Sequence, residues 1–154
     1  MKKLFPRIGL VHAVQVAMAP IEAAFQERWP ETTRMNVFDD ALAPDLEREG
    51  YLTETLETRI GRLAEYCVIS GSDAVLFTCS AFGPAIEKAA ATAPVPVLKP
   101  NEAMFERALS YGAKVGMLAS FQPAVASMEA EFYGQARKLG IDATLETRCI
   151  PEAL

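Results

Sequence analysis

Two stretches of this chain repeat each other at a constant offset of 107 positions, and this repeat restricts the possible folds more than any other feature. Residues 114–118 (KVGML) match residues 7–11 (RIGLV). Seven of some nineteen ungapped positions are identical, namely Gly9/Gly116, Gln15/Gln122, Ala17/Ala124, Ala19/Ala126, Glu22/Glu129, Ala23/Ala130 and Phe25/Phe132. Such self-similarity indicates a duplicated supersecondary unit. We therefore expect two related lobes, residues 1–112 and residues 113–154.

Short apolar runs alternate along the chain with segments of helical periodicity. The expected strands are residues 7–11, 35–38, 74–77, 95–98, 114–118 and 144–150, and the expected helices are residues 17–28, 52–66, 84–91, 102–111 and 124–139. The first of these helices has an apolar face at Met18, Ile21, Ala24 and Phe25, and residues 41–44 are expected to form a loop. This alternation is typical of parallel sheets with right-handed crossovers. The predicted fold is α/β, with a parallel sheet flanked by helices and two pseudo-repeated, Rossmann-like lobes, the second incomplete in this chain.

The composition argues against several classes of protein. The net charge of −5 is not gathered in runs and only 8% of residues are aromatic, so the basic stripe of a nucleic-acid surface is not expected. The three cysteines are odd in number and lack the short spacing of zinc sites, which indicates reduced thiols. No stretch approaches the ~20 apolar residues of a membrane span, and polar residues and Pro6 interrupt any signal-peptide core. We expect a cytoplasmic protein without a metal site.

One thiol lies where a parallel sheet binds its ligands. Residues 74–77 are wholly apolar, as in a strand buried on both faces, and Cys79 follows directly. Ligands bind at the carboxyl ends of such strands, and the helix that begins near Gly83 favours a thiolate or an anion there. The alternative is that Cys79 is a small buried hydrophobe. Cys67 is expected in the core, and Cys149 within the second strand of the second half.

Other polar residues also follow predicted strands. His12 ends the first strand, where it either contacts the site at its rim or is a half-buried strand-end residue. Gln15 and its repeat partner Gln122 are ligand contacts or, in the favoured reading, helix-start residues. Asp39 and Asp40 follow the second strand and are expected to be turn and capping residues. The polar residues at positions 99, 101 and 102 are expected to form a helix-entry loop.

Several enzyme classes lack their sequence signatures here. A cysteine hydrolase or glutamine amidotransferase of this kind needs a histidine after the nucleophile, and no histidine follows Cys79. The pattern G-x-S-x-G of serine hydrolases is absent from the sequence. So are G-x-G-x-x-G and the P-loop, so that no nucleotide is indicated.

Taken in order, five segments carry a resemblance to a known family. They are IGLVHA (8–13), NVFDDAL (36–42), FTCSAFGPAIE (77–87), PVLKPNEAM (96–104) and VGMLASF (115–121). The chain resembles the aspartate/glutamate/hydantoin racemase superfamily, whose relatives include arylmalonate decarboxylase and maleate isomerase. The resemblance implies two α/β lobes, no cofactor, and one cysteine from each lobe beside the α-carbon of a small carboxylate. It places Cys79 as the catalytic acid/base of the first lobe and Ser80 and Ser120 as carboxylate binders. His12, Gln15 and Asn36 are further candidate substrate contacts.

The chain departs from the family pattern in its second half. The repeat equivalent of Cys79 falls near position 186, and Cys149 is not that cysteine. We therefore retain three alternatives to a racemase or isomerase: a decarboxylase, a cysteine-dependent hydrolase, and a non-catalytic protein that binds a small carboxylate or assembles. Apolar faces of the strand at Val115 and of the helix 124–139 are expected to be partly uncovered, which predicts a homo-oligomer.

Overall fold

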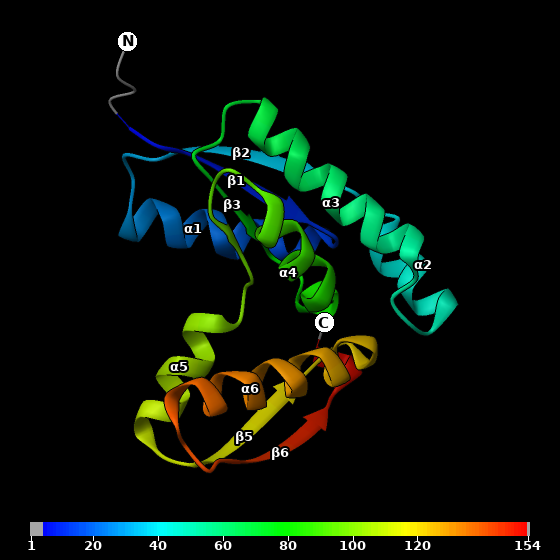
Figure 1. Cartoon of the computed structure of the whole chain (residues 1–154), viewed down its shortest axis with the longest axis vertical. Coiled ribbons are helices and arrows are strands. Elements are labelled where there is room, and N and C mark those ends of the chain that lie inside the picture. The colour runs from blue at the N-terminus through cyan, green and yellow to red at the C-terminus, as the bar shows by residue number, and fades with distance from the viewer. Residues whose placement is uncertain (1–4, 154) are drawn as a thin grey trace.

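The computed structural model describes residues 5–153 and has two parts that lie one above the other in Figure 1. The upper part holds a four-stranded sheet in the order β2-β1-β3-β4, and the lower part holds a two-stranded sheet of β5 and β6. The strands pair in parallel. They are β1 (Arg7–His12), β2 (Thr33–Phe38), β3 (Ala74–Phe77), β4 (Val97–Leu98), β5 (Lys114–Ala119) and β6 (Thr144–Cys149). The predicted parallel α/β fold is confirmed.

The sequence repeat is also a repeat of structure. β5 begins 107 positions after β1, and the 3-10 turn η3 (Gln122–Ala124) follows η1 (Gln15–Ala17) by the same offset. α1 (Met18–Arg28) and α6 (Val125–Leu139) come next in each lobe. A parallel strand then pairs with the first one in each sheet, starting at Arg7↔Thr33 and at Lys114↔Thr144. The two lobes therefore begin with the same strand-turn-helix-strand unit.

The core of the upper part forms between its sheet and α3 (Glu54–Ile69), which contacts β1, β3 and α4 (Gly83–Thr92). The buried stripe of α3 is Leu56, Ile60, Ala64 and Cys67, at helical spacing. The predicted core position of Cys67 is confirmed, since its side chain is fully buried. A Cβ atom on Gly9 would lie 2.8 Å from the Cβ and Sγ atoms of Cys67. Gly9 thus permits β1 and α3 to approach closely.

The predicted loop at residues 41–44 is wrong, because α2 (Leu42–Glu49) begins there. Pro44 lies in the first turn of this helix, where its missing N–H costs no hydrogen bond. Leu42, Ala43 and Leu46 are buried, so tertiary packing supplies the stability of the short helix. The Asp39 carboxylate accepts a hydrogen bond from the Ala41 backbone N–H at 3.2 Å and pairs with Arg59, as expected of a turn residue.

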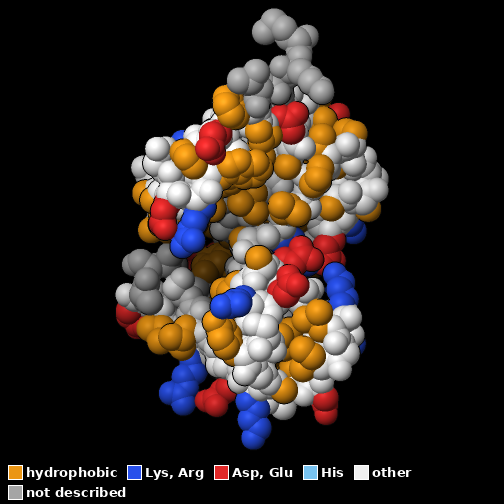
Figure 2. All heavy atoms as spheres, turned by 90° about the vertical axis from the view of Figure 1, so that its left-hand side faces the viewer, with side chains coloured by type: hydrophobic (Ala, Val, Ile, Leu, Met, Phe, Trp, Pro, Cys, Tyr) orange, Lys and Arg blue, Asp and Glu red, His pale blue; other side chains and the backbone are white. Residues whose placement is uncertain are grey.

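The predicted apolar face of α1 is only partly covered. α1 has no buried residue: Met18, Ile21 and Phe25 are half-buried, and Ala24 is exposed. Figure 2 shows hydrophobic side chains gathered over the upper half of the face it presents. Val16 and Trp29, on either side of α1, are 58% and 46% exposed. This part of the surface is more apolar than the charged lower half in the same view.

α5 (Glu102–Tyr111), which has the predicted bounds, lies in the lower part beside α6, and the segment between β4 and α5 joins the two parts (Figure 1). Phe105 of α5 meets Phe132 of α6 edge to face, with ring centroids 5.6 Å apart. On β5, Met117 and Ala119 are buried against this pair of helices, whereas Leu118 is 71% exposed. One face of the small sheet is therefore uncovered, as expected. None of the helices in residues 5–153 combines the length and the apolar character needed to cross a membrane.

Candidate active site

The loop that carries Cys79 lies at the carboxyl edge of the four-stranded sheet. β1 and β3 run side by side with Val11 opposite Phe77, and the backbone N–H of Thr78 donates to the Val11 carbonyl at 3.0 Å. This bond extends the parallel ladder by one residue and fixes the direction of the chain into Cys79. The turn η2 (Ser80–Phe82) and α4 follow immediately. The predicted strand-loop-helix corner is present, with one additional 3-10 turn.

The segment that follows β5 reaches the same place. η2 contacts both η3 and α6, so the start of the second lobe packs against the Cys79 loop. A Cβ atom on Gly83 would lie 2.7 Å from Ser127 Oγ of α6, which shows how closely the two lobes approach here. Ser120 lies between β5 and η3 and is half-buried. The structure thus brings the turn after Cys79 against the turn η3, which begins two residues after Ser120.

Burial raises the pKa of the Cys79 thiol above its ordinary value, while the backbone N–H of Ala81 favours the thiolate and offsets part of this effect. Ala81 is the middle residue of η2, so the turn itself provides this N–H. Burial is the larger influence. At neutral pH the resting form of Cys79 is therefore the protonated thiol.

His12 is fully buried, so its predicted position on the rim of the site is wrong. Two hydrogen bonds hold the imidazole at the end of β1. Its Nδ1 lies 2.9 Å from Thr78 Oγ1, and its Nε2 lies 2.7 Å from Asn36 Oδ1. His12 therefore contacts the Cys79 loop through Thr78, the residue that directly precedes the thiol.

The tautomer of His12 follows from its neighbours. Asn36 donates its amide to Glu22 Oε1 at 2.8 Å, which turns the Oδ1 acceptor toward the imidazole. The Nε2 atom of His12 must therefore carry the hydrogen of that bond. Nδ1 then accepts from the Thr78 hydroxyl in the neutral ring, or donates to it in the imidazolium, with the hydroxyl turned to the Val11 carbonyl 3.3 Å away. Both charge states of the ring can be satisfied.

Glu22 and Arg34 extend this polar chain away from Cys79. Arg34 Nε pairs with Glu22 Oε2 at 3.0 Å. The hydrogen bond from Asn36, with further contributions from Arg34, lowers the pKa of the Glu22 carboxyl. The sequence analysis did not select Thr78, Glu22 or Arg34. The adjacency of Thr78 to Cys79 and the repeat identity of Glu22 with Glu129 were the available signals.

The remaining candidates are placed as follows. Ser80 is the first residue of η2 and is half-buried, next to Cys79. Gln15 is exposed at the start of η1, and Asn36 is exposed on β2 with its amide bound to His12 and Glu22. Cys149 ends β6 opposite Ala119 in the other sheet. Among the described residues, no cluster of three or more His, Cys, Asp or Glu side chains has an arrangement that could hold a metal ion.

Comparison with protein-family models identifies one family, and comparison with solved structures finds the same fold in racemases. The profile of the family described as Asp/Glu/Hydantoin racemase matches residues 11–146. The glutamate racemase from Aquifex pyrophilus has a similar structure, with a TM-score of 0.72 and 18% identity over 92% of this chain and 54% of that one. The Picrophilus torridus aspartate racemase has a TM-score of 0.66 and 14% identity over 91% of this chain and 62% of its own. This chain thus spans little more than half the length of these structures. A search of curated proteins by sequence finds no match.

Proposed function

The chain belongs to the Asp/Glu/hydantoin racemase family, and from this premise we propose that it moves a proton at the α-carbon of a small carboxylate, with Cys79 as acid and base. The solved structures to which it is similar are described as racemases of glutamate and aspartate. The proposed substrate class therefore comprises acidic amino acids and related small carboxylates, and also hydantoins, in which a ring carbonyl takes the place of the carboxylate beside the acidic C–H bond. The reaction class is racemisation or isomerisation.

The chemistry requires a base at contact distance and donors aimed at the charge that develops. In the thiolate form, the Cys79 sulfur takes the α-proton, and the electron pair of the C–H bond moves into the carboxylate to give an enediolate. Hydrogen-bond donors that face the enediolate oxygens stabilise it. Ser80 and Ser120 are the proposed donors from the two loops that meet here. Gln15 and Asn36 are proposed as contacts farther from the sulfur.

Because Cys79 rests as the protonated thiol, we propose that it donates a proton to the substrate more readily than it removes one. Because burial raises the pKa of Cys79, the thiol is poised to deliver a proton to an enediolate from its side. Removal of a proton by Cys79 requires the thiolate, which the N–H of Ala81 and the approaching helix N-terminus favour. In a two-base racemase the opposite face of the substrate needs a second acid/base group. The proposal assigns Cys79 to one face only.

The observation that carries this proposal is the position of Cys79. The thiol follows the last residues of β3, at the edge of a parallel sheet where ligands bind. The turn η3, which begins two residues after Ser120, contacts the turn that follows Cys79 from the other lobe. His12, buried beside Thr78, is proposed to hold the loop in place rather than to contact the substrate.

Exchange of the α-hydrogen in D₂O tests the proposal directly. Aspartate, glutamate and a 5-substituted hydantoin are incubated with the protein, and loss of the α-proton signal is followed by ¹H NMR together with optical rotation. We expect exchange with at least one of these compounds and its loss in Cys79→Ser. Cys149→Ser is the matched control and should retain exchange. Equal exchange in Cys79→Ser and the unmodified protein would remove Cys79 from the mechanism.

A further inference from the structure

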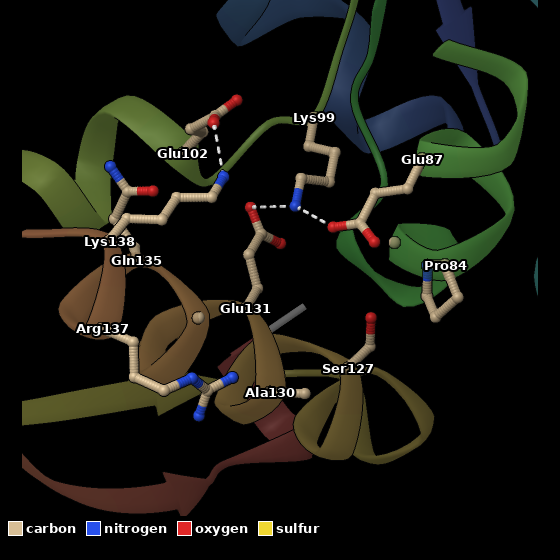
Figure 3. A pocket seen from close by; sticks show the side chains of 12 residues that line it. Pro84, Glu87, Lys99, Glu102, Ser127, Ala130, Glu131, Gln135, Arg137 and Lys138 are labelled. Atoms are coloured by element: carbon tan, nitrogen blue, oxygen red, sulfur yellow. Dashed lines mark hydrogen bonds and ion pairs between the residues drawn. The ribbon is translucent and has the colours of Figure 1, made fainter. Parts of the chain in front are cut away.

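A cavity of about 270 Å³ lies between the two lobes, outside the Cys79 loop. α4 forms one wall and α6 the other, and the start of α5 and the residue Lys99 close one end (Figure 3). Pro84 and Ala130 provide apolar surface, whereas Ser127 and Glu131 of α6 provide polar groups. The cavity has room for several water molecules or for one small organic molecule.

Glu131 is the unusual residue of this cavity. Its side chain is 6% exposed, and neither carboxylate oxygen has a hydrogen bond of normal geometry within the described part of the chain, although Lys99 and the buried amide of Asn101 lie near enough to lower the pKa of this carboxyl. Figure 3 shows this carboxylate pointing from α6 toward Lys99 and Glu87. A buried carboxylate without hydrogen bonds is costly, because water no longer solvates it. Ser127 Oγ, one turn earlier on α6, is also buried and without a partner.

One ammonium group is shared between two carboxylates. Lys99 Nζ lies 2.6 Å from Glu87 Oε1 and 3.6 Å from Glu131 Oε1. Burial lowers the pKa of Lys99, but the bond to Glu87 and the charges of Glu131 and its neighbours outweigh this effect, so that the pKa is raised. Lys99 is thus charged and already engaged. The two carboxylates around it leave one negative charge uncompensated.

The other charged groups of the cavity do not remove this excess. Lys138 Nζ lies 3.9 Å from Glu102 Oε1, so these two charges offset each other. Figure 3 shows the guanidinium of Arg137 directed away from the Glu131 carboxylate. Burial raises the pKa of Glu131, and the charge of Lys99 offsets this only in part. Lys99 and the Asn101 amide are thus the nearest donors to Glu131, but the one positive charge of Lys99 is shared between two carboxylates, and a second cation with hydrogen-bond donors would balance the cavity.

We propose that this cavity is a ligand site for a small primary ammonium compound, whose N–H groups donate to the Glu131 carboxylate and the Ser127 hydroxyl. The apolar stem of such a compound would lie against Pro84 and Ala130. A primary ammonium provides three donors on a compact charge, which matches several unpartnered acceptors close together. The residues from 5 to 153 contain no three-ligand cluster for a metal ion, which favours an organic cation. This site does not depend on the activity proposed for Cys79.

The test uses the full chain and n-butylammonium chloride as the probe, with binding measured by isothermal titration calorimetry and ligand-observed NMR. We expect saturable binding of the probe, with an affinity that falls roughly tenfold or more in Glu131→Gln. This is the size of effect that follows removal of one charged hydrogen bond. Ser127→Ala should weaken binding severalfold and tests the site without changing any charge. Glu129→Gln, on the same helix but outside the cavity, is the matched control and should bind as the unmodified protein does.

Two further probes distinguish the proposed contacts from nonspecific attraction. Tetramethylammonium carries the same charge without N–H donors and should bind at least tenfold more weakly than n-butylammonium. Potassium chloride at equal concentration should not displace the probe. The proposal is overturned if n-butylammonium does not bind, if Glu131→Gln and Ser127→Ala both bind it as the unmodified protein does, or if potassium competes equally. In each of those cases the cavity is not a site for a primary ammonium group.

Discussion

The Nδ1 atom of His12 lies 2.9 Å from Thr78 Oγ1, and Thr78 is joined by one peptide bond to Cys79. The only histidine of the chain is thus coupled to the Cys79 loop through a single hydroxyl. Since the imidazole is fully buried, it has no access to water that could replace this bond. The position of the Cys79 loop and the hydrogen bonding of His12 therefore depend on the same contact.

Thr78→Val should destabilise the protein by about 1–3 kcal/mol, because it leaves the buried Nδ1 of His12 without a partner while keeping the shape of the side chain. The Val11 carbonyl keeps its hydrogen bond from the backbone N–H of residue 78. The expected loss of stability therefore does not come from the pairing of β1 with β3. Urea unfolding followed by circular dichroism measures the change. Thr78→Ser retains the hydroxyl, so its free energy of unfolding should fall clearly less than that of Thr78→Val. Equal losses in the two variants would show that the methyl group, and not the bond to His12, matters.

The Cys79 thiol should ionise at a higher pH than an ordinary cysteine, whose pKa is about 8.5, because burial raises its pKa. The rate of alkylation by iodoacetamide, resolved by peptide mass spectrometry, should therefore still be rising above that pH. Cys67 serves as the internal reference, since burial raises its pKa to about 11 and its side chain is fully buried. It should react last. A midpoint for Cys79 near neutral pH would mean that the helix N-terminus outweighs burial.

Local sequence patterns predicted most of the fold because they depend on neighbours along the chain. The apolar runs give β3 its predicted bounds, the helical period gives α5 its predicted bounds, and the repeat offset recurs in β5 and η3. α2 was missed because its first turn contains Pro44 and because three of its eight residues are held by burial. Burial is a tertiary property that an eight-residue pattern does not reveal.

The candidate site was predictable only in part, for the same reason. The position of Cys79 after a strand can be seen in the sequence, but the contacts of His12 depend on strand register. β1 and β2 pair with Leu10 opposite Asn36, which brings the Asn36 amide within reach of His12. The cavity at Glu131 depends on the approach of α6 to Gly83 of the other lobe. A pattern of neighbouring residues in the sequence does not predict this contact between the two lobes.

Gly9 and Gly116 occupy equivalent positions in the repeat and should respond differently to alanine. A Cβ atom at Gly9 would meet Cys67 Cβ at 2.8 Å, and neither backbone can shift without moving β1 or α3. Gly9→Ala should therefore cost about 1–3 kcal/mol in the free energy of unfolding. At Gly116 no described atom lies within 4 Å of the new Cβ, so Gly116→Ala should be neutral or slightly stabilising. Chemical denaturation measures both, and similar losses would contradict the assigned contact.

Glu131→Gln should stabilise the protein more as the pH rises. The pKa of Glu131 is raised above 4.5 in the folded state by burial, so between the two pKa values the folded chain binds more protons than the unfolded chain. The free energy of unfolding then falls with rising pH across that window and stays lower above it. The glutamine variant lacks this pH-dependent contribution to stability, while the other charged groups that face the cavity, Glu87, Lys99, Glu102 and Lys138, are present in both proteins.

The measurement is urea unfolding of both proteins at a series of pH values from about 4 upward, with the difference in unfolding free energy plotted against pH. Glu129→Gln, the same substitution on the same helix but outside the cavity, is the control for the change of side chain itself. A difference between Glu131→Gln and the unmodified protein that decreases with rising pH would mean that the fold stabilises the Glu131 anion. Lys99 at 3.6 Å would then outweigh burial as the main influence on Glu131.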